Sequence, residues 1–203
     1  MNKEVKIFYT SDWHFGHKNI IRYCNRPFDL SDEGVAQCTD FIKKEYCSVV
    51  GPDDFVFFLG DAFFGGSKKK YAFRDLVQSM TGKKIMIRGN HDYESDSFYL
   101  SCGFLEIENY ISFGKYFICH FDLTEKTDDE EHHCSEEDVL REVFKKSGCE
   151  FIIHGHTHTL SPVSDDCVRY NVCIDNPKNS FRPVRIKGSE ADAVAYLKAR
   201  HFL

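Results

Sequence analysis

Apolar residues in the first half of the chain gather in short runs that end abruptly in polar residues, and the segments between the runs have helical spacing. The runs predict strands at 5–12, 54–61 and 83–92. The intervening segments predict helices at 16–25, 31–47 and 67–80. The second of these helices is expected to begin at a Ser31 or Asp32 cap. Because strands and helices alternate, the pattern favours βαβ crossovers and a mainly parallel sheet.

The second half of the chain has a different pattern. Residues 107–120 predict a hairpin that turns at Gly114 and Lys115. A helix is predicted at 135–148, because acidic residues occupy its first turn, lysines its last, and Gly148 follows them. The remaining predictions are an acidic loop at 122–134, strands at 150–158, 168–175 and 182–186, and a helix at 190–202. Together the elements predict one α/β domain over residues 1–203.

Composition narrows the class of protein. A hydrophobic content of 42% with 29% charged residues is typical of a globular chain. The formal net charge of −6 argues against broad nucleic-acid binding, which depends on excess Lys and Arg, but it leaves open a small phosphorylated substrate. The nine cysteines are odd in number and include no CxxC pair, so we expect reduced thiols in a cytosolic protein.

The sequence contains no signal for a membrane. The N-terminus lacks an apolar signal core, and no run approaches the roughly 18 apolar residues of a membrane span. We therefore expect a cytoplasmic protein without a membrane partner, and the sequence leaves the oligomeric state open.

Polar clusters follow several of the predicted strands. They contain Ser11–His14, Gly60 and Asp61, Gly89–Asp92, Cys119 and His120, and His154–His158. The carboxyl ends of parallel strands meet at one edge of a sheet, and open α/β sheets bind ligands at that edge. We therefore expect these clusters to converge in space, although more than 140 residues separate the first from the last.

The side chains in these clusters are of the kinds that hold transition metals. Asp12 and His14 are two residues apart, as are His156 and His158, so each pair points the same way from an extended segment. Carboxylates, imidazoles and an amide favour a transition metal over calcium. Together they exceed the needs of one tetrahedral zinc ion, whereas two ions sharing a carboxylate would use them all. Taken singly, each cluster is also compatible with a turn or a cap.

The order of the polar clusters along the chain resembles that of the motifs in a known family. D-x-H, G-D, G-N-H-D, a lone His after a strand, and G-H-x-H resemble the signature blocks of the calcineurin-like metallophosphoesterase superfamily, and here they span residues 12–158. The extension "HFGHKNIIRYCNRPF" at 14–28 is similar to small uncharacterised bacterial and phage members. The resemblance implies a four-layer α/β/β/α sandwich with mixed sheets and a site at the carboxyl ends of the strands.

The resemblance also implies the roles of the site residues. It places Asp12, His14 and His158 on a first ion, Asn90, His120 and His156 on a second, and Asp61 between the two. A hydroxide shared by the ions would attack phosphorus in line, and His91 would hydrogen-bond a phosphoryl oxygen or protonate the leaving group. The mixed ligand set accepts two divalent transition-metal ions, with Mn²⁺ expected in vitro and Fe, Zn²⁺ or Ni²⁺ as alternatives.

Residues near the first cluster are candidates for contact with substrate. We predict such contacts for Arg26, Arg22 and His17, because a guanidinium can bind two non-bridging phosphate oxygens. The alternative is that an arginine pairs with a nearby acid such as Asp29. Supporting roles are expected for Trp13 facing the core or the side opposite its neighbours, Asp92 in its turn, Asn171 and Asp175 in strand pairing, His154 inside the fold, and His132 with His133 as an exposed pair.

The predicted activity is two-metal-dependent hydrolysis of a phosphoester, with a phosphodiester of nucleotide type as the favoured substrate. A phosphomonoesterase or a pyrophosphate-link hydrolase of the same fold is an alternative. A non-catalytic scaffold, like the retromer subunit that resembles a phosphoesterase, and a structural zinc protein are alternatives from other classes. The presence of His91 and of all seven ligand positions argues against the scaffold, and the cysteine-free ligand set argues against structural zinc.

Overall fold

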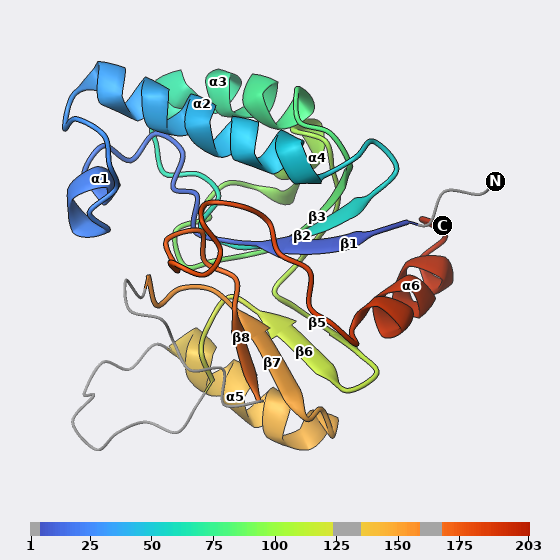
Figure 1. The fold of residues 1–203 in the computed structure, drawn as a ribbon. Helices are drawn as coiled ribbons and strands as arrows, with labels where there is room; N and C mark the ends of the chain where they lie inside the picture. The colour runs from blue at the N-terminus through green and yellow to red at the C-terminus, as the bar shows by residue number, and fades with distance from the viewer. Residues whose placement is uncertain (1–4, 124–134, 159–167) are drawn as a thin grey trace.

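The fold is described by a computed structural model that covers residues 5–123, 135–158 and 168–203. Within these ranges the strands form two four-stranded sheets (Figure 1). The first sheet has the order β1 (Ile7–Thr10), β2 (Phe55–Leu59), β3 (Lys83–Ile87) and β4 (Phe104–Glu108). The second has the order β5 (Tyr110–Phe113), β6 (Tyr116–Cys119), β7 (Phe151–His154) and β8 (Arg169–Asn171).

The strands of the first sheet are all parallel, and β1, β2 and β3 are buried on both faces apart from Lys83 at the start of β3. Successive side chains of a strand point to opposite faces, and β2 shows the consequence. Phe55, Phe57 and Leu59 pack into the cluster between the two sheets. Val56 and Phe58 pack into the cluster beneath the helices. Both faces of β2 therefore need apolar residues, which explains the continuous apolar run in the sequence.

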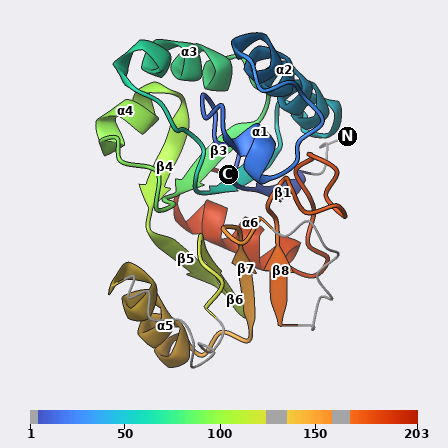
Figure 2. The ribbon, with the colours of Figure 1, turned by 90° about the vertical axis from the view of Figure 1, so that its left-hand side faces the viewer.

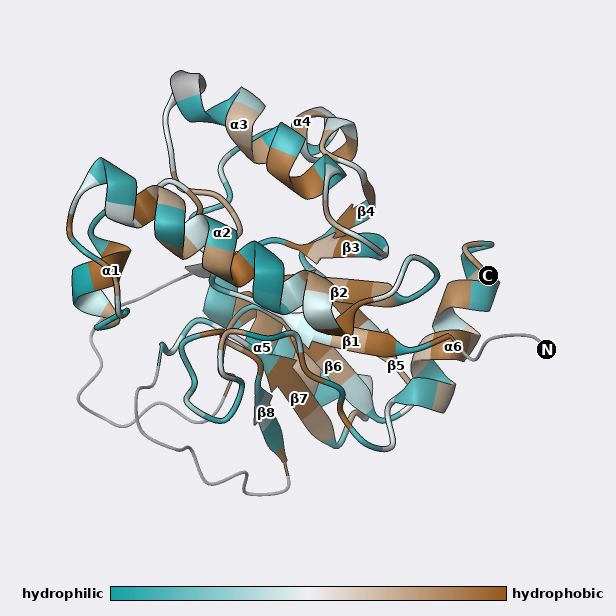
Figure 3. Ribbon diagram, turned by 45° about the horizontal axis from the view of Figure 1, so that its top comes forward, coloured by the Kyte–Doolittle hydropathy of each residue, from teal (hydrophilic) through white to brown (hydrophobic). Residues whose placement is uncertain are grey.

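Helices cover the outer face of the first sheet. These are α2 (Asp32–Val49), α3 (Ser67–Gln78) and the short α4 (Asp96–Ser101). In α2 the buried side chains recur every four residues, at Cys38, Ile42 and Tyr46, and the Ser31 hydroxyl accepts a hydrogen bond from the Gly34 N–H at 3.0 Å. The predicted cap at Ser31 is confirmed. In Figure 3 hydrophilic and hydrophobic residues alternate along α2, whereas β6 and β7 are largely hydrophobic.

The second sheet is mixed, and a helix on its outer face forms the fourth layer. The β5–β6 hairpin is antiparallel and turns at Gly114 and Lys115 as predicted, and the pairs β6–β7 and β7–β8 are parallel. Helix α5 (Ser135–Ser147) packs on the outer face of this sheet through Leu140, and α6 (Glu190–Ala199) packs at the side of the inter-sheet core. The layers run helices, sheet, sheet, helix (Figure 1). The predicted α/β/β/α sandwich is confirmed, and of its two sheets the second is mixed whereas the first is all parallel.

Several predicted elements differ from the structure. The predicted helix at 16–25 is reduced to the single turn α1 (Ile20–Tyr23). The predicted strand at 182–186 makes only an isolated bridge between Val184 and Tyr9. Helix α4 and strand β4 were not predicted, because the alternating residues of β4 adjoin the hairpin and resemble its first strand.

Two further observations concern the described part of the chain. None of its helices has the length and apolar character needed to cross a membrane. All seven of its cysteines are free thiols. His132, His133 and most of the acidic loop lie outside the described residues.

Candidate metal centre

The predicted ligand residues lie just after the carboxyl ends of five strands. Asp12 and His14 follow β1, Asp61 follows β2, Asn90 follows β3, His120 follows β6, and His156 and His158 follow β7. Backbone hydrogen bonds join these loops, with Asp12 N–H donating to the Gly60 carbonyl at 3.0 Å and Gly155 N–H donating to the His120 carbonyl at 2.9 Å. Figure 2 looks onto this edge, where β1–β4 lie above β5–β8. Each sheet therefore contributes to one shared site.

One group of ligand atoms combines two carboxylates and two imidazoles. It consists of Asp12, His14, Asp61 and His158, whose ligand atoms all lie within 4.8 Å of one another. The Nε2 atoms of His14 and His158 are 2.9 Å apart. An oxygen of Asp61 lies 3.4 Å from His14 Nε2, and an oxygen of Asp12 lies 3.4 Å from His158 Nε2. These four side chains are able to hold a metal ion.

A second group shares Asp61 with the first. It consists of Asp61, His120 and His156, again within 4.8 Å of one another. His120 Nε2 lies 2.9 Å from Asn90 Oδ1, 3.1 Å from His156 Nδ1 and 3.5 Å from the same Asp61 oxygen that faces His14. Of the residues in these two groups, Asp61 alone belongs to both.

The second group brings acceptor atoms together, so it needs an additional proton or a cation to be stable. His120 Nδ1 donates to the Leu59 carbonyl at 2.7 Å, so its Nε2 presents a lone pair to Asn90 Oδ1 and to Asp61. Acceptors that face each other need a proton or a cation between them. Burial opposes protonation of His120, but the hydrogen bond and the charge of Asp61 outweigh it and raise its pKa to about 9. A divalent cation could be coordinated by the same lone pairs, so the residues present fit a metal ion.

Two other histidines of the centre remain neutral. Burial lowers the pKa of His14 to about 4, against the charges of Asp61 and Asp12. Burial and the neighbouring His120 lower the pKa of His156 to about 4. A neutral imidazole keeps the lone pair that a metal ligand needs.

The backbone at the centre is bent into an unusual conformation. Asp12, His14, Asp61, His156 and His158 all have positive φ, between 42° and 68°. Residues other than glycine seldom adopt this left-handed region, and it costs about 1 kcal/mol or more at each position. The fold around these loops therefore holds five of the seven predicted ligands in strained positions, which is typical of functional sites.

Two glycines allow the loops to approach the carboxylates closely. A Cβ on Gly155 would lie 2.2 Å from Ser11 Oγ and 2.5 Å from an oxygen of Asp12. A Cβ on Gly89 would lie 2.3 Å from an oxygen of Asp61. The glycines of the G-N-H-D and G-H-x-H motifs thus leave room for the carboxylates, in addition to forming turns.

Asp92 connects the loops after β2 and β3 through hydrogen bonds. Its buried carboxylate accepts hydrogen bonds from the N–H groups of Asp61 at 2.7 Å, Gly89 at 2.8 Å and Ala62 at 3.2 Å, and from the Tyr99 hydroxyl at 3.2 Å. Burial and the charge of Asp61 raise its pKa to about 6. The structure therefore gives Asp92 the turn-organising position expected from the sequence.

Arg26 lies behind the centre and not at its mouth. Its side chain is 1% exposed, and Nε and Nη2 donate to the two oxygens of Asp175 at 2.8 and 2.9 Å. The guanidinium also donates to the carbonyls of Trp13 at 3.1 Å and Asp12 at 2.9 Å. This placement contradicts the predicted contact with substrate, because the guanidinium is buried and its donors are occupied. The partner is an acid, but it is Asp175 and not Asp29.

Asp175 connects Arg26 to the centre, a role that sequence reasoning missed. One of its oxygens lies 2.8 Å from His158 Nδ1, which leaves His158 Nε2 facing His14. Burial opposes a charge on His158, but the hydrogen bond to Asp175 raises its pKa well above the usual range. A carboxylate behind a metal-binding histidine orients the ring and increases its basicity. No sequence signal distinguishes Asp175 from other acids that end a strand.

Comparison with known proteins settles the family. The sequence model of the calcineurin-like phosphoesterase family matches residues 5–160, about three quarters of the chain. The chain belongs to the calcineurin-like phosphoesterase family. The predicted resemblance is confirmed, and membership supports hydrolysis of phosphoesters as the general activity.

The names of two curated relatives of this phosphoesterase-family chain state no activity. Over 93 residues it is 42% identical to the uncharacterized protein MJ1445 of Methanocaldococcus jannaschii, which covers 46% of this chain and 50% of the relative. Over 85 residues it is 34% identical to the gene 66 protein of Mycobacterium phage L5, which covers 42% of this chain and 39% of the relative. The chain thus matches half or less of the length of these curated relatives.

A solved structure shares the fold. The crystal structure of the protein of unknown function AQ665 from Aquifex aeolicus matches 96% of this chain and all of its own chain, with a TM-score of 0.68 and 22% identity. At this identity the likeness concerns the fold alone.

The other residues predicted to act on substrate are Arg22, His17 and His91. They lie at the surface of this phosphoesterase-family chain or beside the two ligand groups. Arg22 is exposed on α1, and its guanidinium lies 5.2 Å from the ring centroid of Tyr23. His17 is half-buried, with its ring 5.8 Å from that of His14. His91 is half-buried, and its ring lies 5.5 Å from that of His14. His17 and His91 therefore border the centre, whereas Arg22 faces solvent.

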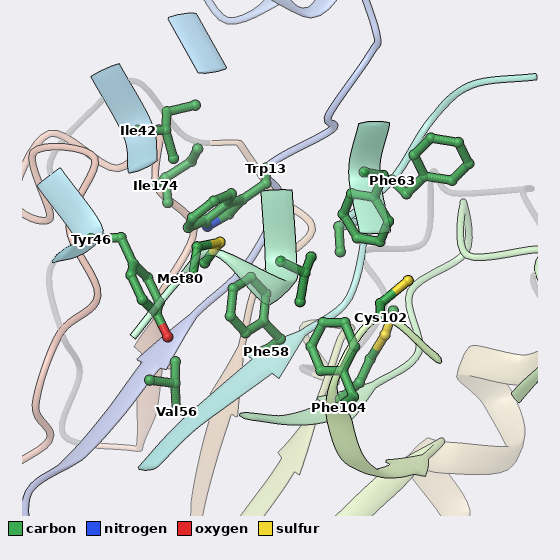
Figure 4. Packing of buried hydrophobic residues seen from close by; sticks show 14 of the residues in the cluster. Trp13, Ile42, Tyr46, Val56, Phe58, Phe63, Met80, Cys102, Phe104 and Ile174 are labelled. Carbon is green, nitrogen blue, oxygen red and sulfur yellow. The ribbon is translucent and has the colours of Figure 1, made fainter. Parts of the chain in front are cut away.

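The predicted supporting residues mostly have the expected positions. Trp13 is buried in the core beneath the helices, 5.2 Å from the ring of Phe58 (Figure 4). His154 is buried and its Nδ1 lies 2.9 Å from the Gly155 carbonyl. The side chain of Asn171 joins Thr157 and Cys173 at the end of β8. Asp175 is the exception, since it serves Arg26 and His158 and not strand pairing.

Replacing Asp175 with asparagine is expected to weaken metal binding by about 10- to 100-fold, because His158 loses the carboxylate that orients it. The measurement is metal affinity by competition with a chromophoric chelator. Asp54→Asn is the matched control, since Asp54 is also buried but lies at the other end of β2, where it accepts from the Lys6 and Gly51 N–H groups. Equal metal affinity in the two variants would refute the role of Asp175.

Proposed function

We propose that this chain is a metal-dependent phosphodiesterase whose two ions are bound by the two groups that share Asp61. The observation that carries the proposal is the common carboxylate between two adjacent sets of ligand atoms. The first ion would be held by Asp12, His14, Asp61 and His158, and the second by Asp61, Asn90, His120 and His156. Two divalent ions, when bound, supply Lewis acidity and a water made acidic enough to attack phosphorus.

The chain's own residues would position the reactants. The Leu59 carbonyl and the Asp175 carboxylate fix which nitrogen of His120 and of His158 faces the centre. His91 borders the centre, and its Nδ1 is buried without a hydrogen-bond partner. A free imidazole at this position is suited to donate a hydrogen bond to a phosphoryl oxygen or a proton to the leaving oxygen.

The placement of the arginines supports a diester over a monoester. A phosphomonoester carries close to two negative charges at neutral pH, and a diester carries one. Arg26 is buried against Asp175, and Arg22 lies over Tyr23. Neither guanidinium is placed to neutralise the second charge of a monoester, so the singly charged diester is the better match.

A panel of metals and substrates tests the proposal. Protein stripped with a chelator would be reconstituted with Mn²⁺, Ni²⁺, Zn²⁺ or Fe²⁺ and assayed with bis(p-nitrophenyl) phosphate, p-nitrophenyl phosphate and ATP. We expect no activity in the stripped protein, recovery with at least one metal, and the highest kcat/KM with the diester. Faster turnover of the monoester or of ATP would refute the diester preference. Two bound ions per chain without any turnover would favour a scaffold.

Replacing His91 with glutamine is expected to lower kcat for the diester about 100-fold, because the leaving oxygen loses its proton donor. The bound metal, measured by elemental analysis, should stay at the wild-type level. His201→Gln, an exposed histidine beyond α6, is the control and should keep full activity. A wild-type kcat in His91→Gln would exclude the proposed role.

A further inference from the structure

A cavity of about 310 Å³ adjoins His91, between the loop after β2 and the loop after β3. Its walls are the rings of Phe63, Phe64 and Tyr93, the backbone of residues 65–66, the imidazole of His91 and the side chain of Glu94. Tyr93 is 79% exposed, so its ring is not part of the core.

His91 connects this cavity to the metal centre. Its ring lies 5.5 Å from the ring of His14 on one side. On the other sides it lies 5.2 Å from Phe64 and 6.2 Å from Tyr93, both nearly perpendicular to it, at 81° and 88°. An ester with its phosphorus beside the predicted ligands would therefore direct one of its organic groups past His91 into the cavity.

The walls of the cavity are held by the rest of the fold. Phe63 is buried in the core beneath the helices, where its ring lies 5.0 Å from that of Phe73 and 6.1 Å from that of Phe98 (Figure 4). Phe64 packs on His17, with ring centroids 4.2 Å apart. Because these rings are fixed before a ligand arrives, stacking on them would require little further ordering.

The charge and size of the cavity restrict its occupant. Among the described residues that line it there is no lysine or arginine, so the lining itself offers no cation to a second phosphate. The carboxylate of Glu94 is balanced by an ion pair with Lys70, which lies outside the lining. A volume of about 310 Å³ is at the lower end of the range for small-molecule pockets, which suits a single ring system and not a peptide.

We infer that this cavity binds the nucleobase, or a comparable planar nitrogen heterocycle, of the phosphoester substrate, with Phe64 and Tyr93 as the stacking residues. Aromatic side chains stack on the face of a base, and Glu94 is an acceptor for N–H groups at its edge. This inference rests on the proposed function, because it assumes that the phosphate of the same molecule lies at the metal centre.

The test compares two ligands that differ only in the base. Adenosine 5′-monophosphate and ribose 5-phosphate would be titrated into metal-loaded protein by calorimetry, and each would be measured as an inhibitor of bis(p-nitrophenyl) phosphate hydrolysis in initial-rate assays. We expect the wild-type protein to bind adenosine 5′-monophosphate about tenfold or more tightly than ribose 5-phosphate.

Single substitutions then test which residues cause the preference for the ligand with the base. Phe64→Ala and Tyr93→Ala should each reduce the preference for the base severalfold, while metal content and the affinity for ribose 5-phosphate stay unchanged. Tyr93 is largely exposed, so its variant should fold even if Phe64→Ala does not. Tyr71→Ala is the matched control, because Tyr71 is a 67% exposed tyrosine on α3 outside the cavity, and it should retain the full preference.

The outcomes separate this inference from the proposed function. Equal binding of the two ligands by a protein that hydrolyses the diester would overturn the base pocket and leave the phosphodiesterase intact. A preference that survives both substitutions would also overturn it. A preference that is lost in both variants, in a protein that hydrolyses no ester, would support the pocket and refute the enzyme.

Discussion

Replacing Asp61 with asparagine is expected to lower kcat/KM for the diester about a thousandfold, since both proposed ions lose the carboxylate they share and several kcal/mol of charge stabilisation with it. The bound metal should fall from two ions per chain to one or fewer. Steady-state kinetics and elemental analysis on the same preparation measure the two effects. The amide keeps the size of the side chain, so a loss of activity would report on charge and not on packing.

The control for this substitution is Asp53→Asn. Asp53 is exposed in the turn before β2, at the opposite end of the strand from Asp61. It should keep wild-type activity and metal content. A variant Asp61→Asn with two tightly bound ions and normal turnover would show that Asp61 is not the bridge.

Replacing Arg26 with alanine is expected to destabilise the protein by about 3–5 kcal/mol, because it leaves Asp175 buried without its charged partner. For a chain of this size the melting temperature should fall by about 10 °C. Thermal unfolding followed by circular dichroism, with and without metal, measures the change. Metal binding should weaken as well, since Asp175 orients His158.

Arg22→Ala provides the matched comparison. It removes the same charge four residues away, but Arg22 is exposed, so stability should change by less than about 0.5 kcal/mol. If instead Arg26→Ala kept the wild-type melting temperature and raised only KM, the buried role would be wrong and the contact with substrate predicted from the sequence would be restored.

The positions of the candidate ligands could be predicted because each follows an apolar run. A sequence such as that of β2, with Gly60 and Asp61 directly after it, identifies both the strand and the end at which polar side chains gather. The parallel arrangement of β1 and β2 explains why Asp12 and Asp61 meet at one edge of the first sheet. The convergence of Asp12 with His158 also needs the packing of the two sheets, because β1 and β7 belong to different sheets, and the apolar pattern does not predict that packing.

The role of Arg26 could not be predicted in the same way. Its partner Asp175 lies 149 residues away, at the end of a predicted strand and outside the five polar clusters. An arginine near a phosphate site and an arginine in a buried ion pair look the same in a sequence, because the difference lies in which side of the loop faces the core. Helix α4 and the start of strand β4 were also missed, since a short helix and a strand next to a hairpin lack separate boundaries in the apolar pattern.

The division of ligands between the sheets has a mechanical consequence. Asp12, His14, Asp61 and Asn90 are carried by the part of the chain that builds β1–β3, whereas His120, His156 and His158 are carried by the part that builds β6 and β7. Bound cations would therefore link two halves of the molecule that are also joined by apolar packing and by hydrogen bonds such as that from His120 to the Leu59 carbonyl. The free energy of metal binding would then stabilise the folded state of both halves. A shortage of metal would therefore lower the stability of the whole sandwich as well as its activity.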